Sequence, residues 1–284
     1  MRFTKMQAYG NDYVYIDAIN QKLDNLNELA KFVSDRHFGI GSDGMVLICP
    51  SDVADFRMRI FNPDGTEAEM CGNAIRSVGK YVYDHKLTDK TTLKIETLGG
   101  IKTLELTVEN GVVTNIRANI SRPIFDPKLI PVNTNKDKFI MEDVKILDQT
   151  FKLSSISWGN PHTVLFVDDV MNFDVEKYGP AIERNTEVFP KKTNVTFAEI
   201  VNKDYIKIRE WERGTGETIG CGTGCSTAVV IASTLGYTNR SCKVEQIGGI
   251  LEIEYAENGE LYMKGPSHFV FESDIDVSHI IGEK

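Results

Sequence analysis

The chain has 284 residues, and its 32 lysine and arginine residues against 41 aspartate and glutamate residues give a formal net charge of −9. Hydrophobic residues make up 41% and charged residues 26%, which is the composition of a globular protein rather than of a disordered chain. The acidic balance, with no basic patch to offset it, excludes nucleic acid as an expected partner, because phosphate backbones are repelled by negative charge.

The first half of the chain reads as strands around one helix. Residues 12–17 and 45–49 are runs of aromatic and β-branched or aliphatic residues, which are typical of strands. Residues 56–61 alternate apolar and polar side chains, the period of a half-buried strand. Helical spacing of apolar residues follows Cys71, and residues 93–108 return to strands around a Gly-Gly pair.

The second half has the same order of elements. Strands are expected at residues 163–167, 195–198 and 205–211, and a helix is expected after Cys221, closed by Gly236 as a helix C-cap. Strands follow again at residues 242–255.

Two segments stand outside this order. Residues 133–148 are polar and have no counterpart in the first half, so we expect an insertion or connecting excursion there. Residues 268–275 form one more strand, which we expect to return to the first domain.

Short motifs recur at an offset of 149 or 150 residues. They keep the same order in both halves: Gly-Asn at 10–11 and 159–160, an aromatic residue at 61 and 211, glutamate at 67 and 217, Cys-Gly at 71–72 and 221–222, and Gly-Gly at 99–100 and 248–249. A constant offset over several motifs indicates an internal duplication. We therefore expect an α/β (α+β) fold of two pseudo-symmetric domains, each a sheet wrapped around a central helix. One comprises residues 1–120 plus 267–284, and the other residues 121–266.

The cysteines and glycines exclude several kinds of site. Five cysteines form an odd and sparse set, which argues against a disulfide framework and for a reducing cytoplasmic location. No histidine or second cysteine pair lies at ligand spacing near Cys221 and Cys225, so no metal site is expected. Residues 39–44 match G-x-G-x-x-G but precede a strand rather than follow one, which favours a tight turn over a cofactor site. No spanning helix or secretion signal is expected either.

Cys71 and Cys221 carry the functional prediction, because each precedes a helix and is followed by glycine. A helix N-terminus offers unpaired N–H groups and the positive end of the helix dipole, which bind a carboxylate and lower the pKa of a thiol. Inverting a stereocentre needs a base on one face and an acid on the other, and a duplicated fold supplies both. The rival interpretation is a thiol hydrolase that pairs one cysteine with His162, which leaves the second cysteine without a role.

Five longer motifs run along the chain: YGND at Asn11, MCGNAIR at Cys71, WGNPH at 158–162, WERGTGET at 211–218 and CGTG at Cys221. On these motifs the chain resembles the diaminopimelate epimerase family over nearly its whole length. The resemblance implies a cofactor-independent amino acid epimerase or racemase, expected to be a homodimer, with Cys71 and Cys221 as the acid–base pair. His162 and Glu212 are implied to support the chemistry near the reacting amino group. The implied substrate-binding residues are Asn11, Asn62, Gly72, Asn73, Asn160, Asn194, Arg213, Gly222 and Thr223.

The substrate depends on details in which the chain departs from the family pattern. Trp158, Gly44, Cys225 and residues 190–194 differ from the residues common in the family. The expected reaction interconverts LL- and meso-diaminopimelate, with Arg213 on the distal carboxylate. The alternative is a racemase of another amino acid such as histidine, on whose ring Trp158 could stack. A third hypothesis is a non-catalytic protein that binds amino acids.

Overall fold

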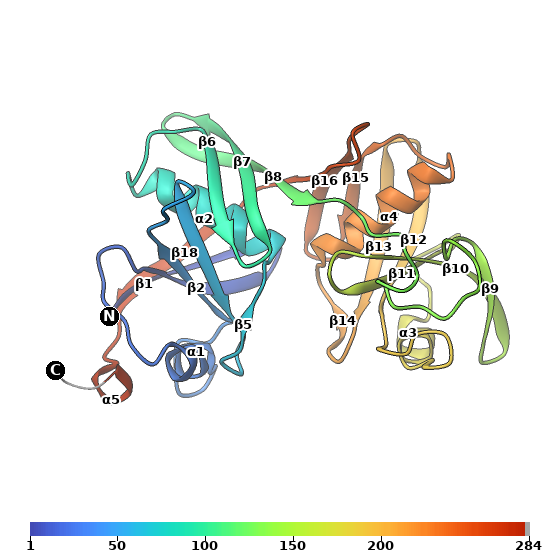
Figure 1. The fold of residues 1–284 in the computed structure, drawn as a ribbon, viewed down its shortest axis with the longest axis horizontal. Helices are drawn as coiled ribbons and strands as arrows, with labels where there is room; N and C mark the ends of the chain where they lie inside the picture. The colour runs from blue at the N-terminus through green and yellow to red at the C-terminus, as the bar shows by residue number, and fades with distance from the viewer. Residues whose placement is uncertain (282–284) are drawn as a thin grey trace. The chain divides into compact units, whose positions relative to one another are not determined.

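The computed structural model describes residues 1–281 (Figure 1). The chain forms two compact units, one made of Met1–Asn119 with the segment from Lys264 onward, the other of Ile120–Met263. Within the described residues, no helix has the length and apolar character needed to cross a membrane.

Within residues 1–281, the first unit consists of three helices and a sheet. The helices are α1 (Leu26–Ser34), α2 (Gly72–Asp84) and α5 (Ser278–Ile281). The strands are β1 (Arg2–Ala8), β2 (Asn11–Asp17), β3 (Met45–Cys49), β4 (Phe56–Phe61), β5 (Glu67–Ala68), β6 (Thr92–Thr97), β7 (Gly100–Glu109), β8 (Val112–Ser121) and β18 (His268–Asp274).

The second unit repeats this plan. Its helices are α3 (Val175–Glu183) and α4 (Gly222–Thr234). Its strands are β9 (Glu142–Ile146), β10 (Gln149–Ser157), β11 (Pro161–Phe166), β12 (Asn194–Asn202), β13 (Tyr205–Glu212), β14 (Gly216–Thr218), β15 (Ser241–Gln246), β16 (Gly249–Tyr255) and β17 (Leu261–Gly265).

Strand pairing follows the same sequence in both units. In the first, β2 is parallel to β3, β3 is antiparallel to β4, and β4 is parallel to β6. In the second, β11 is parallel to β12, β12 is antiparallel to β13, and β13 is parallel to β15. This equivalence confirms the predicted fold of two similar α/β domains.

Each sheet surrounds one buried helix (Figure 1). In α2 the buried Ala74, Ile75, Val78 and Val82 recur at helical spacing, and the absence of a side chain at Gly79 lets β7 approach. The second helix, α4, is buried at nine consecutive positions, 224–232. Two of these are polar, and the hydroxyls of Ser226 and Thr227 donate to backbone carbonyls of the preceding turn. The two helices are the central elements predicted from the sequence.

The helix α4 ends as predicted. The N–H of Gly236 bonds to the carbonyl of Ser233, and Gly236 has φ of 74°, a conformation that glycine adopts without a Cβ penalty.

Four other parts of the chain remain to be compared with the predictions. The helices α1 and α3 were not predicted, although they occupy repeat-equivalent positions at an offset of 149 residues. The polar segment 133–148 contains β9, which pairs with β10, so it is not entirely an irregular excursion. β18 pairs antiparallel with β1. Residues 39–44 follow helix α1 and precede β3, the reverse of a dinucleotide site, and they form an irregular connection in which Gly41 adopts a φ of +83°.

Candidate active site

Cys71 occupies the N-cap position of α2 in the first unit. Its backbone is extended, with φ of −137° and ψ of 125°, so the helix begins at Gly72 as predicted. The Cys71 thiol lies 3.6 Å from Oδ1 of Asn11, and the hydroxyl of Tyr13 lies 3.9 Å from the sulfur. The thiol is half-buried, with polar groups rather than a purely apolar wall around it.

Two other predicted residues of this unit join the Cys71 cluster. Asn73 donates from its amide to Oδ1 of Asn11 at 3.3 Å. The fully buried Arg76 donates to the carbonyl of Gly72 at 2.9 Å and to Oδ1 of Asn73 at 2.7 Å. Arg76 therefore fixes the first turn of α2 from within the unit, a role that the sequence did not indicate although the residue lies in the quoted MCGNAIR motif.

Asn11 is oriented from its other side by acidic residues. Its amide donates to Oδ2 of Asp43 at 2.8 Å, and the backbone N–H of Asp12 donates to the same oxygen. Arg36 bonds to both Asp12 and Asp43. Asn11 thus presents its carbonyl oxygen toward Cys71 and Asn73, because its amide is already engaged.

Asn62 is held inside its own turn after β4. Its backbone N–H donates to the carbonyl of Thr66, and its side-chain amide donates to the Thr66 hydroxyl at 3.0 Å. Within residues 1–281 no hydrogen bond connects Asn62 to the Cys71 cluster, so its part in substrate binding stays a prediction.

Cys221 is the equivalent N-cap of α4 in the second unit. Its sulfur accepts from the backbone N–H of Gly224 at 3.4 Å and lies 3.3 Å from the hydroxyl of Thr223. Its own N–H donates to Oε1 of Gln246 at 2.9 Å, an oxygen that also accepts from the Cys225 thiol. Cys221 is buried, whereas Cys71 is only half-buried.

The protonation of Cys221 differs from the sequence expectation. Burial raises the pKa of the Cys221 thiol well above its ordinary value, and the negative charges of Glu210 and Glu212 raise it further. The hydrogen bonds from Thr223 and Gly224 act in the opposite direction but are weaker. The prediction of a lowered thiol pKa was therefore wrong for Cys221, since desolvation and the two carboxylates outweigh the hydrogen bonds from Thr223 and Gly224.

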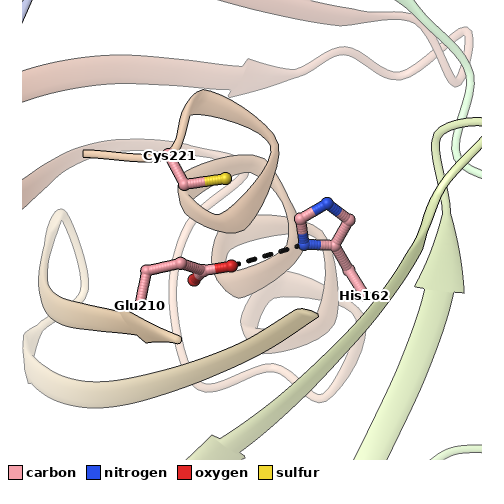
Figure 2. A group of neighbouring side chains, drawn as sticks. All are labelled: His162, Glu210 and Cys221. Carbon is pink, nitrogen blue, oxygen red and sulfur yellow. Dashed lines mark ion pairs between the residues drawn. The ribbon is translucent and has the colours of Figure 1, made fainter. Parts of the chain in front are cut away.

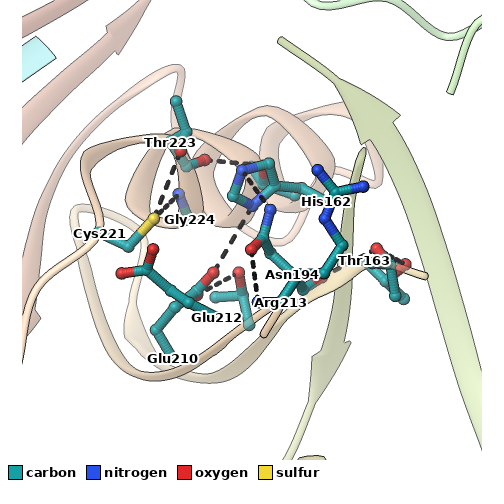
Figure 3. Close-up of polar contacts among 12 residues, drawn as sticks. His162, Thr163, Asn194, Glu210, Glu212, Arg213, Cys221, Thr223 and Gly224 are labelled. Carbon is teal, nitrogen blue, oxygen red and sulfur yellow. Dashed lines mark hydrogen bonds and ion pairs between the residues drawn. The ribbon is translucent and has the colours of Figure 1, made fainter. Parts of the chain in front are cut away.

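His162 lies beside Cys221, as Figure 3 shows. The ring is fully buried on β11, and its Nε2 lies 3.4 Å from the Asn194 amide. Asn194 also donates to the carbonyl of Pro161 and accepts from the N–H of Arg213. These two bonds set the amide orientation, so Nε2 of His162 is an acceptor and the ring proton belongs on Nδ1.

On the opposite side of His162 stands a residue that the sequence analysis did not single out. Oε1 of the buried Glu210 lies 3.6 Å from Nδ1 of His162, and Oε2 accepts from the Thr196 hydroxyl at 2.6 Å. At the equivalent positions of the first unit, Ile60 pairs with Val46. In β13 the inward positions Ile206 and Ile208 lead on to Glu210. A charged residue in the inward phase of a strand was the available signal.

Glu212 and Arg213 lie at the end of β13, before the turn to β14. Oε1 of Glu212 accepts from the Thr218 hydroxyl at 2.7 Å. Arg213 is exposed, and its guanidinium donates to the carbonyl of Lys191 at 2.9 Å. Figure 3 shows Glu212 near Cys221 and Arg213 near Asn194.

The Gly-Asn turn between β10 and β11 carries Trp158 and Asn160. The Trp158 N–H bonds to the carbonyl of Asn160, and the indole Nε1 donates to the Thr227 hydroxyl on α4 at 3.0 Å. Trp158 is thereby tied to the helix that begins after Cys221, whereas the role of Asn160 toward a substrate stays a prediction.

Solved structures share this fold. A Bacillus anthracis phenazine biosynthesis protein of the PhzF family is 19% identical, with a TM-score of 0.70 and coverage of 98% of this chain and 99% of that one. A probable proline racemase from Agrobacterium radiobacter is 14% identical, with a TM-score of 0.65 and coverage of 97% and 93%. At these identities the likeness concerns the fold alone.

Sequence comparison identifies the family. The family model for diaminopimelate epimerase matches residues 3–119 and 154–270. The diaminopimelate epimerase of Methanococcus maripaludis strain C5 is 54% identical and covers 98% of this chain and 100% of its own length. Those of Acetivibrio thermocellus and Agathobacter rectalis are 50% and 48% identical, covering 99% and 98% of this chain and 100% of their own. The chain belongs to the diaminopimelate epimerase family.

Proposed function

We propose that the protein interconverts LL- and meso-diaminopimelate by a two-base mechanism in which Cys71 and Cys221 are the acid and the base. The observation that carries this proposal is their equivalence: each thiol is the N-cap of the buried central helix of its unit. The family membership supplies the reaction class and the substrate.

The reaction requires one thiolate and one thiol on opposite faces of the reacting carbon. The thiolate removes the α-proton, and the electron pair left on carbon is delocalised into the α-carboxylate. The other thiol then delivers its proton to the opposite face and becomes the thiolate. The reverse reaction uses the same two groups in exchanged roles, so atoms and charges balance without an oxidant or reductant.

The raised pKa of Cys221 supports the role of proton donor for that residue in one direction of the reaction. A buried thiol next to two carboxylates favours its protonated form. Cys221 is therefore proposed as the acid in the reaction direction in which Cys71 is the base.

The first turns of α2 and α4 are suited to the α-carboxylate. N–H groups in the first turn of a helix have no partner within the helix, and the helix dipole favours an anion there. Gly72 and Asn73 supply such groups in one unit, and Gly222 and Thr223 supply them in the other. We propose that these donors stabilise the charge that develops as the α-proton leaves.

The remaining predicted residues are assigned to positioning. His162 and Glu212 flank Cys221 and are proposed to hold the reacting amino group. The exposed Arg213 is proposed to bind the distal carboxylate, because a guanidinium can make two parallel hydrogen bonds to it.

Trp158 bears on the alternative substrate. A racemase of histidine could stack the substrate ring on this indole. The bond from its Nε1 to Thr227 ties Trp158 to α4 but does not occupy the ring face, so it does not decide between the substrates. The diaminopimelate epimerase relatives at about half identity make diaminopimelate the better supported substrate.

The test is incubation in deuterated water with diaminopimelate, histidine and other amino acids, followed by mass spectrometry and chiral separation. Exchange of the α-proton with diaminopimelate alone is the expected result. Exchange with histidine instead would establish the alternative racemase. Binding of an amino acid with no exchange would establish a non-catalytic binding protein.

We further propose a cytoplasmic homodimer that works without a cofactor. Five cysteines of the described residues are free thiols, as suits a reducing compartment. The dimer and the absence of a cofactor rest on the family resemblance. Light scattering of the purified protein tests the dimer, and turnover by apoprotein dialysed free of small molecules tests the cofactor.

A further inference from the structure

Three potential metal ligands of different chemical type converge in the second unit (Figure 2). A ring nitrogen of His162, a carboxylate oxygen of Glu210 and the sulfur of Cys221 all lie within 4.8 Å of one another, and all three residues are buried. They come from β11, β13 and the N-cap of α4. Rigid elements thus present the three side chains to a common point.

Two of these ligand atoms lack the hydrogen bond that burial normally demands. Among the described residues, Nδ1 of His162 and Oε1 of Glu210 are buried with no hydrogen-bond partner, although they face each other at 3.6 Å. A buried polar atom left unbonded is costly, so native structures seldom keep one without a reason. Figure 2 shows these two atoms facing each other beside the Cys221 sulfur, which lies within 4.8 Å of a ligand atom of each residue.

The structure assigns this cluster as a binding site for a thiophilic divalent cation such as Zn²⁺. Binding of the cation inhibits the enzyme. Thiolate, imidazole and carboxylate are the donors that zinc takes in proteins. A thiolate and a carboxylate together neutralise the two charges of the cation. Mg²⁺ and Ca²⁺ prefer oxygen donors alone, so they are not expected to bind here.

The geometry needs only a local adjustment. Tetrahedral ligands about 2.0–2.3 Å from zinc lie roughly 3.3–3.7 Å apart, which the His162–Glu210 distance of 3.6 Å already satisfies. Donors as far apart as 4.8 Å must approach by about 1 Å.

Binding also moves two protons. The Cys221 thiol releases its proton to the buffer. If Nδ1 coordinates, the ring proton of His162 moves to Nε2, at the loss of the long 3.4 Å contact with Asn194.

The first unit provides an internal comparison. At the positions equivalent to His162, Glu210 and Cys221 it carries Tyr13, Ile60 and Cys71. Ile60 cannot bind a metal, and the cysteine there lies against Tyr13 and Asn11. One cation per chain is therefore expected, in the second unit.

Metal binding is tested directly, without activity, by titration with Co²⁺ as the spectroscopic probe. We expect one equivalent per chain and a thiolate-to-cobalt charge-transfer band, displaced by Zn²⁺ but not by Mg²⁺. The band should persist in Cys71→Ala and disappear in Cys221→Ala. The matched variants Cys225→Ala and Cys242→Ala should retain it. A band that disappears in Cys71→Ala and persists in Cys221→Ala would overturn the assignment.

Variants of Glu210 distinguish a three-ligand metal site from metal binding by the Cys221 thiol alone. Glu210→Gln should weaken Co²⁺ and Zn²⁺ binding by about tenfold or more. If that variant does not fold, the double variant Thr196→Val/Glu210→Ile reproduces the Val46–Ile60 pair of the first unit and removes the ligand with an apolar replacement. Unchanged affinity in a folded Glu210 variant would contradict the proposal.

Inhibition is the part that rests on the proposed function. Zn²⁺ should inhibit epimerisation reversibly, with activity restored by a chelator, because it occupies the sulfur that must exchange a proton. If the charge-transfer band forms but no substrate is turned over by metal-free protein, the proposed function fails while the metal site stands. If metal-free protein is active and no band forms, the metal site alone fails.

Discussion

The guanidinium of Arg59 donates two parallel hydrogen bonds of 2.8 Å to the carboxylate of Glu67. The same bidentate pair recurs 150 residues later between Arg209 and Glu217, at 2.6 and 2.9 Å. Each pair joins a strand to the short strand that leads into the helix-capping cysteine, β4 to β5 and β13 to β14. Both units thus keep an ion pair that anchors the short strand preceding each cysteine.

Glu67→Gln and Glu217→Gln should each lower the free energy of unfolding by about 1 kcal/mol, because they remove one charged half of a partly buried bidentate pair. They should also reduce kcat, since the chain before each cysteine loses its anchor. Urea denaturation and steady-state kinetics measure the two effects. The matched control is Asp143→Asn, which breaks the exposed pair with Lys152 and should change neither quantity measurably.

Cys71→Ala and Cys221→Ala should each abolish epimerisation while leaving the fold intact, because each removes the proton donor or acceptor on one face of the substrate. Loss of turnover with an unchanged circular dichroism spectrum is the expected result. Near wild-type turnover in either variant would refute the two-base scheme.

Cys49→Ala, Cys225→Ala and Cys242→Ala serve as controls and should keep most of the activity. Cys225 shares the Gln246 oxygen with the backbone of Cys221, so its variant tests whether that shared contact matters. A loss of turnover confined to Cys225→Ala would identify it as a positioning residue for Cys221.

Arg213→Met should raise KM and lower kcat for diaminopimelate. If the bound ion pair is desolvated, the loss in kcat/KM should correspond to about 2–5 kcal/mol of transition-state stabilisation. Remote binding energy also holds the reacting carbon in place, so both constants should change. Arg213→Lys should restore the activity only partly, because lysine cannot form the bidentate pair. An equal kcat/KM for wild type and Arg213→Met would remove Arg213 from the substrate site.

Asp12→Asn should destabilise the protein at neutral pH but not in acid. Although burial opposes it, hydrogen bonds and charge from Lys5 and Arg36 hold the pKa of Asp12 below its ordinary value. The stabilisation is therefore full above the unfolded-state pKa of about 3.9 and is lost as the pH falls through the lower folded-state value. Unfolding by urea should differ by about 2 kcal/mol at pH 7, and the difference should shrink as the pH falls below the unfolded-state pKa of about 3.9. A difference independent of pH would show that the ion pairs are not its source.

The sequence by itself predicted most of the regular elements and the duplication, because these depend on local patterns. Alternation in residues 56–61, helical spacing after Cys71 and a constant 150-residue offset are all readable one segment at a time. The helices α1 and α3 escaped, since a nine-residue helix gives too short a periodic signal to stand out.

The surroundings of each thiol were decided only by the tertiary structure. Both cysteines immediately precede a helix, as the sequence predicted, yet Asn11 and Tyr13 contact Cys71 from the distant strand β2. The sequence predicted a lowered pKa from the helix N-terminus, and folding reversed it at Cys221. The cause is long-range: burial, together with the carboxylates of Glu210 and Glu212, outweighs the local hydrogen bonds from Thr223 and Gly224. Residues distant along the chain set the desolvation and the charge around a buried group, so no local pattern can report them.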